Sequence, residues 1–212
     1  MPQDDKMQRN SDRRRARHED IMAAAYEILA ERGYEKATMA AVAGRARASK
    51  ETLYNWYGDK RSLFAALVAE NASGLCAALD STLDPTADRD IRGILHAFGR
   101  TFLDLLLGER AVALNRAAIA NAANDGSLGD LLATKGRDTV FPQLCRMLEV
   151  ERAAGRLGFD DAEDAGETLL GLLLTDRQTR RLLGTLSPPG QAWIENRART
   201  ATDRFLQVFG TE

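Results

Sequence analysis

Apolar residues recur along the chain mainly at the spacing of one helix face. The first such face predicts a helix over residues 13–32, and Gly33 follows it as the kind of residue that ends a helix. The face consists of Ile21, Ala25, Ile28 and Leu29. The chain therefore begins its folded part with an amphipathic helix.

Capping residues mark the next stretch. Thr38, Ser49 and Asp59 each precede a short apolar segment, and side-chain oxygens there accept hydrogen bonds from the first backbone N–H groups of a helix. Short helices are therefore predicted from Thr38 to about Ala46 and from Ser49 to about Tyr57. A longer helix is expected to begin after Asp59.

Longer helices are predicted for the rest of the chain. Their ranges are 60–83, 89–107, 111–123, 128–154, 161–183 and 191–209. Pro142 lies inside one of them and predicts a kink, and Asp84-Pro85 is expected to end another. The predicted fold is all-α, with an N-terminal three-helix helix-turn-helix head, a larger C-terminal helical bundle and about nine helices in total.

Composition also favours helices over a sheet. The sequence contains 34 Ala and 28 Leu but only 6 Ile and 6 Val. Ala and Leu favour helices, whereas β-branched residues favour strands. Hydrophobic residues make up 44% of the chain and charged residues 28%, which is typical of a soluble globular protein and excludes global disorder.

The sequence further predicts a cytoplasmic location and no membrane partner. The longest strongly apolar stretch, Leu169–Leu174, is too short to span a bilayer, and Met1–Arg17 lacks the apolar block of a signal peptide. Cys76 and Cys145 lie far apart in apolar surroundings. They are interpreted as buried thiols of a cytosolic protein.

Charge divides the chain into two parts although its formal net charge is only −2. Residues 1–63 contain 13 Lys or Arg and 10 Asp or Glu, a net of +3, whereas residues 64–212 contain 16 and 21, a net of −5. Residues 1–16 are predicted to form a flexible basic arm. Two interpretations of this arm stay open, a solvated tail and a segment that contacts DNA.

The spacing of residues 38–57 is typical of a helix-turn-helix, with two short helices joined by a turn of a few residues. The N-terminal part of the second helix of such a unit enters the major groove of DNA. We therefore predict a DNA-binding domain over 17–63, followed by a larger helical domain over 64–212.

The segment Thr38–Leu63, TMAAVAGRARASKETLYNWYGDKRSL, resembles the DNA-binding domain of TetR/AcrR-type transcriptional regulators. The shared marks are Thr38, Val42-Ala43, Ser49, Thr52-Leu53-Tyr54, Tyr57, Lys60 and Leu63. With the first helix, the resemblance covers about residues 17–65. The C-terminal half resembles AcrR/AefR-like members. This resemblance implies that 64–212 is a ligand-sensing and dimerisation domain, with a homodimer formed by the last two long helices and an apolar ligand pocket.

This sequence departs from the family pattern at two places. Arg47 stands in the turn where the family usually has Gly, so either the turn differs or Arg47 adopts a strained left-handed conformation. Asn55-Trp56 stands where the family often has histidines. Asn55 can pair with adenine through two hydrogen bonds, and Trp56 can lie against a backbone sugar or in the core.

The resemblance implies a double-stranded, palindromic DNA operator as partner, and roles follow for the residues of the motif. Lys50, Thr52 and Asn55 are the candidates for contacts to base edges. Candidates for contacts to the phosphate backbone are Thr38, Ser49, Tyr54 and Lys60, with Arg47 in the turn between the helices.

Two further sets of residues are predicted for the C-terminal body. The last two long helices are apolar on more than one side, which favours a homodimer over a helix buried within one subunit. The interface candidates are Leu169, Leu173, Ile194, Ala198, Ala201 and Phe205. Candidates for a pocket that binds an unidentified small apolar effector are His96, Phe98, Phe102, Asn115 and Met147, for each of which a structural role is the alternative.

An enzyme is the rival interpretation. Asp160, Asp161 and Asp164 match the DDxxD pattern with which all-helical prenyl-diphosphate enzymes hold Mg²⁺. Carboxylates at the start of a helix also cap its N–H groups, and we favour this role. No second acidic motif and no nucleophile triad is present in the sequence, so we predict neither an enzyme nor a cofactor. A protein-binding helical module is a third possibility.

Overall fold

The computed structural model describes residues 2–80 and 90–211, and these fold into two compact units. Unit 1 contains the chain up to Val68 together with Ala113–Leu132, and unit 2 contains Ala69–Val112 and the chain from Ala133 onward. The described residues are helical apart from turns and one isolated β-bridge. The predicted all-α fold is confirmed.

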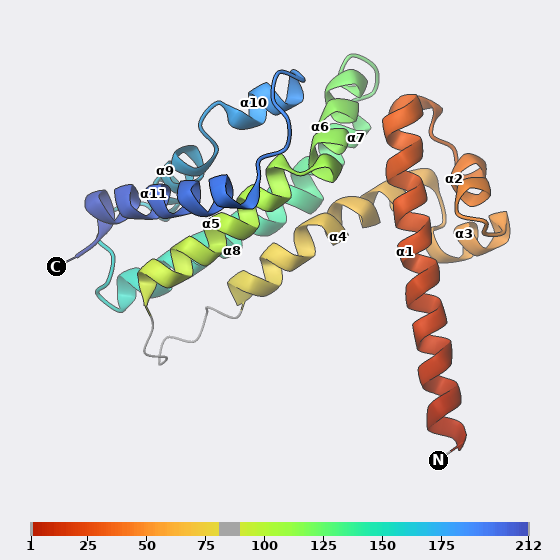
Figure 1. Ribbon diagram of the computed structural model, residues 1–212, viewed down its shortest axis with the longest axis horizontal. Coiled ribbons are helices and arrows are strands. Elements are labelled where there is room, and N and C mark those ends of the chain that lie inside the picture. The colour runs from red at the N-terminus through yellow and green to blue at the C-terminus, as the bar shows by residue number, and fades with distance from the viewer. Residues whose placement is uncertain (1, 81–89, 212) are drawn as a thin grey trace. The chain divides into compact units, whose positions relative to one another are not determined.

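Unit 1 begins with the predicted head. Its helices are α1 (Pro2–Lys36), α2 (Met39–Arg45), α3 (Lys50–Tyr57) and the start of α4 (Lys60–Asp80). Figure 1 shows α2 and α3 packed beside the C-terminal half of α1.

The three predicted caps are confirmed. The side-chain oxygens of Thr38, Ser49 and Asp59 accept hydrogen bonds from backbone N–H groups three residues later, at 3.1, 3.0 and 2.7 Å. These bonds fix the start of each short helix, so the head depends strongly on local polar chemistry.

Helix α1 is longer than predicted. Residues 2–16, expected as a flexible arm, are helical, because they contain no Gly and their one Pro, Pro2, occupies the first helical position, where Pro is tolerated. At the other end, Gly33 has φ 71° and ψ 172°, so the helix is interrupted where Gly33 was predicted to end it.

The core of unit 1 also includes residues from later in the chain. The C-terminal part of α6 (Glu109–Asn121) and α7 (Ser127–Leu132) belong to this unit. Their buried residues share one hydrophobic cluster with Leu53 and Phe64 of the head. These are Leu114, Ala117, Ala118, Leu128 and Leu131. The predicted boundary after residue 63 thus does not separate the compact units, because a segment remote in sequence completes the core of the head.

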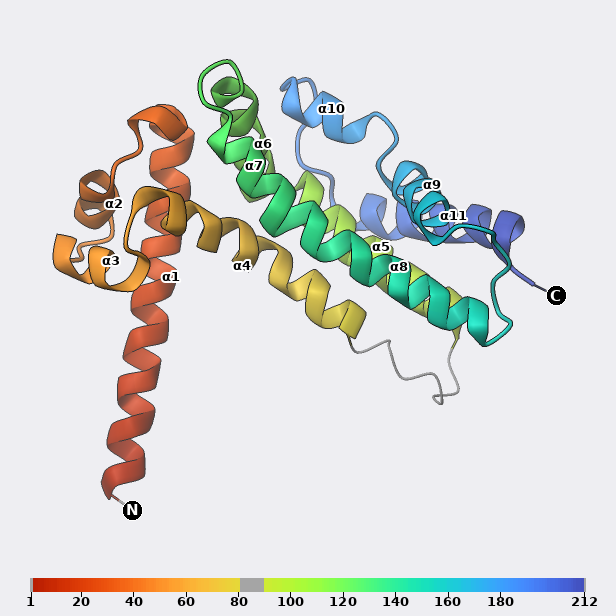
Figure 2. The same cartoon turned by 180° about the vertical axis from the view of Figure 1, so that it is seen from behind.

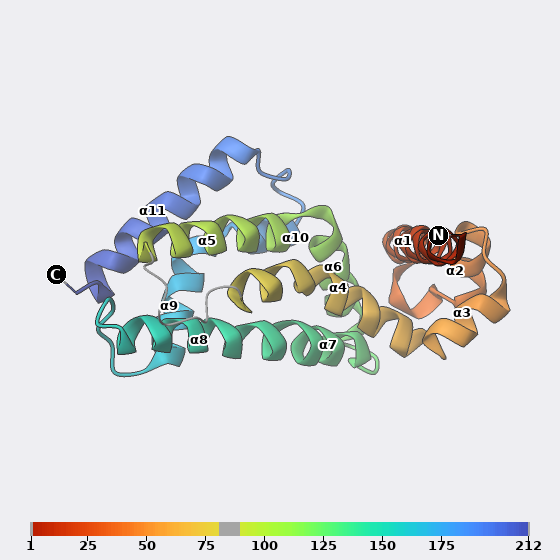
Figure 3. The same cartoon turned by 90° about the horizontal axis from the view of Figure 1, so that it is seen from below.

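Unit 2 is built mainly from long helices. They are α5 (Ile91–Leu107), α8 (Asp138–Ala153), α9 (Ala162–Leu174), α10 (Arg177–Leu182) and α11 (Gln191–Phe209). In Figure 3 the C-terminal part of α4 lies between α5 and α8. Helix α9 packs against both α8 and α11, and it lies in front of α11 in Figure 2. Leu75 and Leu79 of α4 are buried in the same cluster as Leu95, Leu148 and Phe205.

Two predicted helices of the body are broken. The helix expected over 128–154 becomes α7, a π-helical segment η1 (Ala133–Arg137) and α8. The irregular segment ends one turn before Pro142, which lacks an N–H and whose ring would clash with the carbonyl of Asp138 in a regular helix. The helix expected over 161–183 breaks at Thr175, which has φ 49° and gives no sequence signal of a break.

Among the described residues, α4 is the one helix that is long and apolar enough to cross a membrane by length and composition. The longest strongly apolar stretch of the sequence is Leu169–Leu174, and α4 does not stand out beside it because α4 mixes Ala and Leu with scattered polar residues. Leu63 and Leu67 pack in the core of unit 1, and Leu75 and Leu79 pack in the core of unit 2. These four leucines of α4 are therefore used in packing within the two units.

Candidate nucleic-acid interface

The turn between α2 and α3 is strained and is held by α1. Arg47 has φ 50°, a left-handed conformation that costs a non-Gly residue about 1 kcal/mol. The Arg17 guanidinium of α1 donates hydrogen bonds to the carbonyl oxygens of Ala46 and Arg47, both at 3.2 Å. Of the two alternatives left by the sequence, Arg47 therefore adopts the strained form.

A second arginine ties α2 to α1. Arg45 donates to the carboxylates of Glu27 and Glu31, each at 2.7 Å. The hydrogen bond from Arg45 lowers the pKa of Glu31. The positive charge of Arg45 is therefore compensated by two carboxylates of α1 and adds little to the positive charge that the head presents at its surface.

Helix α3 turns one polar face outward. Lys50, Tyr54 and Asn55 are exposed, with Tyr54 53% accessible, whereas Leu53 is fully buried in the core of unit 1. Thr52 is half-buried, and its hydroxyl lies 2.8 Å from that of Ser49. A short helix that is anchored through Leu53 and presents Lys50, Tyr54 and Asn55 has the form needed to reach into a groove.

The residues predicted to contact phosphate differ in how they are placed. Thr38 and Ser49 are exposed at the starts of α2 and α3, and their oxygens already accept capping hydrogen bonds. Lys60 turns toward α1, where its ammonium donates to the carbonyl of Glu35 at 3.2 Å and lies 4.1 Å from the ring centroid of Tyr34. Burial lowers the pKa of Lys60.

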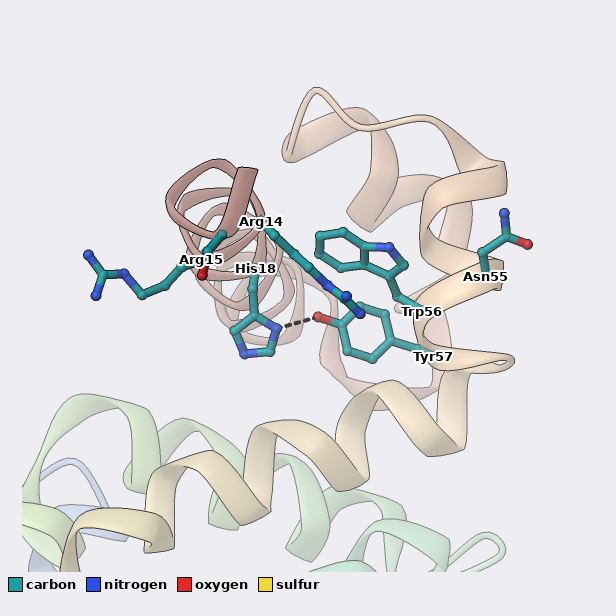
Figure 4. Close-up of a pocket in the computed structure, with 7 residues that line it drawn as sticks. Arg14, Arg15, His18, Asn55, Trp56 and Tyr57 are labelled. Carbon is teal, nitrogen blue, oxygen red and sulfur yellow. Dashed lines mark hydrogen bonds between the residues drawn. The ribbon is translucent and has the colours of Figure 1, made fainter. Parts of the chain in front are cut away.

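A groove that no sequence prediction assigned lies between α1 and α3. Its volume is about 540 Å³. Its lining residues are Ser11, Arg14, Arg15, His18, Asn55, Trp56 and Tyr57. Figure 4 shows the hydrogen bond of 2.8 Å between the Tyr57 hydroxyl and Nδ1 of His18. The Arg14 guanidinium lies over the Trp56 ring, 5.6 Å from its centroid.

The periodicity of α1 contained a signal for this groove. Positions 11, 14, 15 and 18 follow the i, i+3, i+4, i+7 spacing of one helix face. The helix predicted over 13–32 already contained Arg14, Arg15 and His18, but the sequence alone does not show that this face of the helix lies against α3.

The predicted dimer interface is wrong in its residues. Those named are 0–2% exposed within a single subunit, so none of them can contact a partner. They are Leu169, Leu173, Ile194, Ala198, Ala201 and Phe205. The stripe on α11 packs against α5 and α9 instead, and the cause of the error is that the two apolar faces of α11 are hard to rank from the sequence.

The five residues predicted to bind an effector do not lie together. Phe98, Phe102 and Met147 are buried in the core of unit 2, where the two rings stack with centroids 5.6 Å apart. His96 faces α11 with Nε2 3.1 Å from a carboxylate oxygen of Glu195. Asn115 belongs to unit 1.

The acidic run at the start of α9 acts as a cap. The Asp161 carboxylate accepts a hydrogen bond from the Glu163 N–H at 2.9 Å, as the capping interpretation predicted. Asp160, Asp161 and Asp164 border an open hollow of about 800 Å³. Within residues 2–80 and 90–211, no group of three His, Cys, Asp or Glu side chains is arranged to hold a metal ion.

Comparison with known proteins decides the family. Residues 21–67 match the family model for bacterial regulatory proteins of the tetR family. Residues 93–211 match the model for the C-terminal domain of AefR-like transcriptional repressors. The chain belongs to the TetR family. It is therefore a helix-turn-helix transcriptional regulator of a family whose members bind DNA operators and act as dimers.

Solved structures of bacterial and other regulators match this chain over nearly its whole length. A regulator from Agrobacterium tumefaciens is 34% identical with a TM-score of 0.72, and the match covers 92% of this chain and 95% of that one. A putative regulator from Mesorhizobium loti is 26% identical with a TM-score of 0.75, over 92% and 98%. The flavonoid-responsive regulator FrrA is 28% identical with a TM-score of 0.66, over 93% and 98%.

Curated relatives match over shorter stretches. The HTH-type transcriptional regulator YdeS of Bacillus subtilis is 39% identical over 46 residues, and the HTH-type transcriptional activator FasR of Mycolicibacterium smegmatis is 31% identical over 90. These matches span 22% and 42% of this chain and 23% and 40% of the relatives' lengths. The matched families and relatives are regulators, and they do not support the alternative of a prenyl-diphosphate enzyme.

Proposed function

We propose that the protein is a cytoplasmic, homodimeric repressor that binds a palindromic operator through α3 and leaves it when a small apolar effector binds. The observation that carries the proposal is the outward face of α3. Lys50, Tyr54 and Asn55 are exposed on a helix whose start is fixed by Ser49 and whose inner side is anchored by Leu53. Membership of the family supports DNA as the partner.

Base reading is assigned to Lys50, Thr52 and Asn55. Lys and Asn side chains match the acceptors of guanine and the donor and acceptor pair of adenine in the major groove. Thr38, Ser49 and Tyr54 flank this face, and their hydroxyls are suited to donate to phosphate oxygens. Arg47 contributes charge at the turn. Lys60 contacts phosphate only if its ammonium leaves the Glu35 carbonyl.

The dimer interface is reassigned to the half-exposed side of α9 and α11. Leu170 and Leu174 lie four residues apart on α9, and the Trp193 ring of α11 lies 4.0 Å from the Arg177 guanidinium. Arg197 donates to the carbonyl of Leu173 at 3.2 Å, which brings this side of α11 next to α9. A two-fold dimer presents two recognition helices to two half-sites about one DNA turn apart.

Only the chemical class of the effector is assigned. The AefR-like match supports a repressor. The name of FrrA, which is 28% identical, describes it as flavonoid-responsive, and this supports a small, largely apolar effector for the present chain. A small, largely apolar molecule that binds the body and favours a conformation with wrongly spaced heads would weaken operator binding. An operator complex that resists every compound bound by the body would contradict this part of the proposal.

Substitutions on α3 test the proposal. Asn55→Ala is expected to weaken operator binding about fivefold or more, since a good contact to a base is worth roughly 1–3 kcal/mol. Tyr54→Ala should also weaken it, because a contact to phosphate is lost. Fluorescence anisotropy of a labelled operator measures the Kd. The matched control is Ile119→Ala on α6, which removes an equally exposed side chain (63%) and should leave the Kd unchanged. Unchanged affinity in both α3 variants would contradict the assignment of α3 as the helix that contacts the operator.

A further inference from the structure

The groove between α1 and α3 continues the recognition face. Asn55, a base-reading candidate, also lines the groove, and its neighbours Trp56 and Tyr57 form one wall. The other wall is the α1 face that carries Arg14, Arg15 and His18 (Figure 4). A strand of DNA read by Asn55 would therefore pass beside two arginines from another helix.

The arginines are held in different ways. Arg14 lies over the Trp56 ring at 5.6 Å, a cation–π contact that orients the guanidinium without neutralising it. Arg15 points away from Trp56 in Figure 4, and its nearest carboxylate is that of Glu19 at 3.8 Å. Both members of that pair are more than two-thirds exposed (76% and 67%), so the pair is weak and easily exchanged for another anion.

Side-chain contacts join α1 to α3 and to the turn before it. The hydrogen bond between Tyr57 and His18 joins α3 to α1 at the base of the groove, and the two rings stack at 6.2 Å. Arg17, on the next turn of the same helix, holds the carbonyls of Ala46 and Arg47. These contacts hold the part of α1 that carries both arginines next to α3.

We infer that this groove is a second DNA contact, in which Arg14 and Arg15 bind the phosphodiester backbone next to the base read by Asn55. The inference rests on the proposed function and extends it from α3 to α1. Guanidinium groups bind phosphate oxygens through paired hydrogen bonds. The groove offers two guanidinium groups. Among the described contacts of Arg14 and Arg15, the one carboxylate is that of Glu19, 3.8 Å from Arg15. Trp56 is the positioning residue that holds Arg14.

Salt dependence of binding tests this inference. Removal of one phosphate-binding side chain is expected to reduce the slope of log Kd against log salt by about 0.9. Arg14→Ala and Arg15→Ala should each lower the slope by about that amount. At low salt each should weaken binding to different DNA sequences by a similar factor, because a phosphate contact does not depend on sequence. Arg14→Lys and Arg15→Lys, which keep the charge, should restore most of the slope. Arg32→Ala is the matched control, because this exposed arginine lies on the same helix roughly 25 Å from Arg15.

The outcomes separate the inference from the proposed function. If the unmodified protein selects no DNA sequence, the proposed function fails and the inference falls with it. If the unmodified protein binds its operator and both alanine variants keep the slope of Arg32→Ala, the inference alone is overturned. Thermal unfolding of each variant checks that its head is folded. If Arg14→Ala fails to fold because Trp56 has lost its cation–π partner, the salt dependence of Arg15→Ala alone decides the inference.

Discussion

The two units of this regulator are stabilised by different chemistry. In unit 1, short helices are fixed by side-chain caps, by the arginine pairs between α1 and α2, and by a strained turn held through Arg17. In unit 2, long helices approach closely at glycines. A Cβ on Gly99 would lie 2.9 Å from the side chain of Leu173, and one on Gly166 would lie 3.1 Å from the ring of Phe141.

This difference matches the tasks proposed for the units. A DNA-reading surface needs polar side chains at fixed positions, and caps and ion pairs fix them without covering them. A sensing body needs a packed interior that can adopt a second arrangement, because a small ligand acts by favouring one packing over another. Local polar substitutions should therefore disturb unit 1, and volume changes should disturb unit 2.

The largest effect is expected from a cavity in unit 2. Phe205→Ala removes a fully buried ring of α11 and should lower the free energy of unfolding by about 3–5 kcal/mol. Urea unfolding followed by circular dichroism measures the change. Val208→Ala, on the same helix and 67% exposed in the subunit, should change the stability of the monomeric unit by less than about 0.5 kcal/mol. Similar losses in both variants would contradict the assignment of the core.

A pair of glycines on α9 should give changes of opposite sign. Gly166→Ala places a methyl group 3.1 Å from Phe141 and is expected to destabilise by about 1 kcal/mol or more. Gly171→Ala on the same helix meets nothing within 4 Å and should stabilise by about 0.5–1 kcal/mol, since Ala favours a helix over Gly. Differential scanning calorimetry compares the two, and equal Tm values would remove the case for close packing at Gly166.

The turn of unit 1 should respond to relief of strain. Arg47→Gly allows φ near 50° at no steric cost and should stabilise the folded head by at most about 1 kcal/mol. Arg47→Ala keeps the strain and serves as the control for loss of the side chain. Comparison of urea midpoints measures both. A less stable glycine variant would show that Arg47 contributes more through its side chain than it costs through its backbone.

The smallest expected effect is a pH dependence in the acidic range that arises from carboxylates of unit 1. Hydrogen bonds lower the pKa of Glu31, with Arg45 as donor, and of Asp59, with Ser62 as donor. A carboxyl group whose pKa is lower in the folded state stabilises the fold above its unfolded pKa, and this stability is lost as the pH falls through the folded value. Urea midpoints should therefore decline below about pH 4.5, and the decline should be shallower in Glu31→Gln.

The sequence allowed prediction of the features that depend on local chemistry. The caps at Thr38, Ser49 and Asp59, the glycine at the end of α1 and the bounds of α11 are all confirmed, because each follows from residues within one or two turns. The family resemblance over Thr38–Leu63 is confirmed for the same reason, since a contiguous motif has a fixed spacing.

Features that depend on packing escaped prediction. Helix α11 has two apolar sides, and only the packed structure shows that Ile194 and Phe205 face inward. The break at Thr175 has no local signal, because the residue is held at φ 49° by its surroundings and not by its own preference. The groove beside Asn55 escaped prediction although the helix predicted over 13–32 includes Arg14, Arg15 and His18, because only the packed structure brings this face of α1 next to α3.

Selection of bound sequences from a random DNA pool by the purified protein tests the central claim most directly. The account predicts a palindromic consensus with half-sites about one helical turn apart. In the Asn55→Ala variant, preference should relax at one position of each half-site while the other positions are kept. Enrichment of no sequence by the folded protein, or an identical consensus for Asn55→Ala, would contradict the claim that α3 reads the operator.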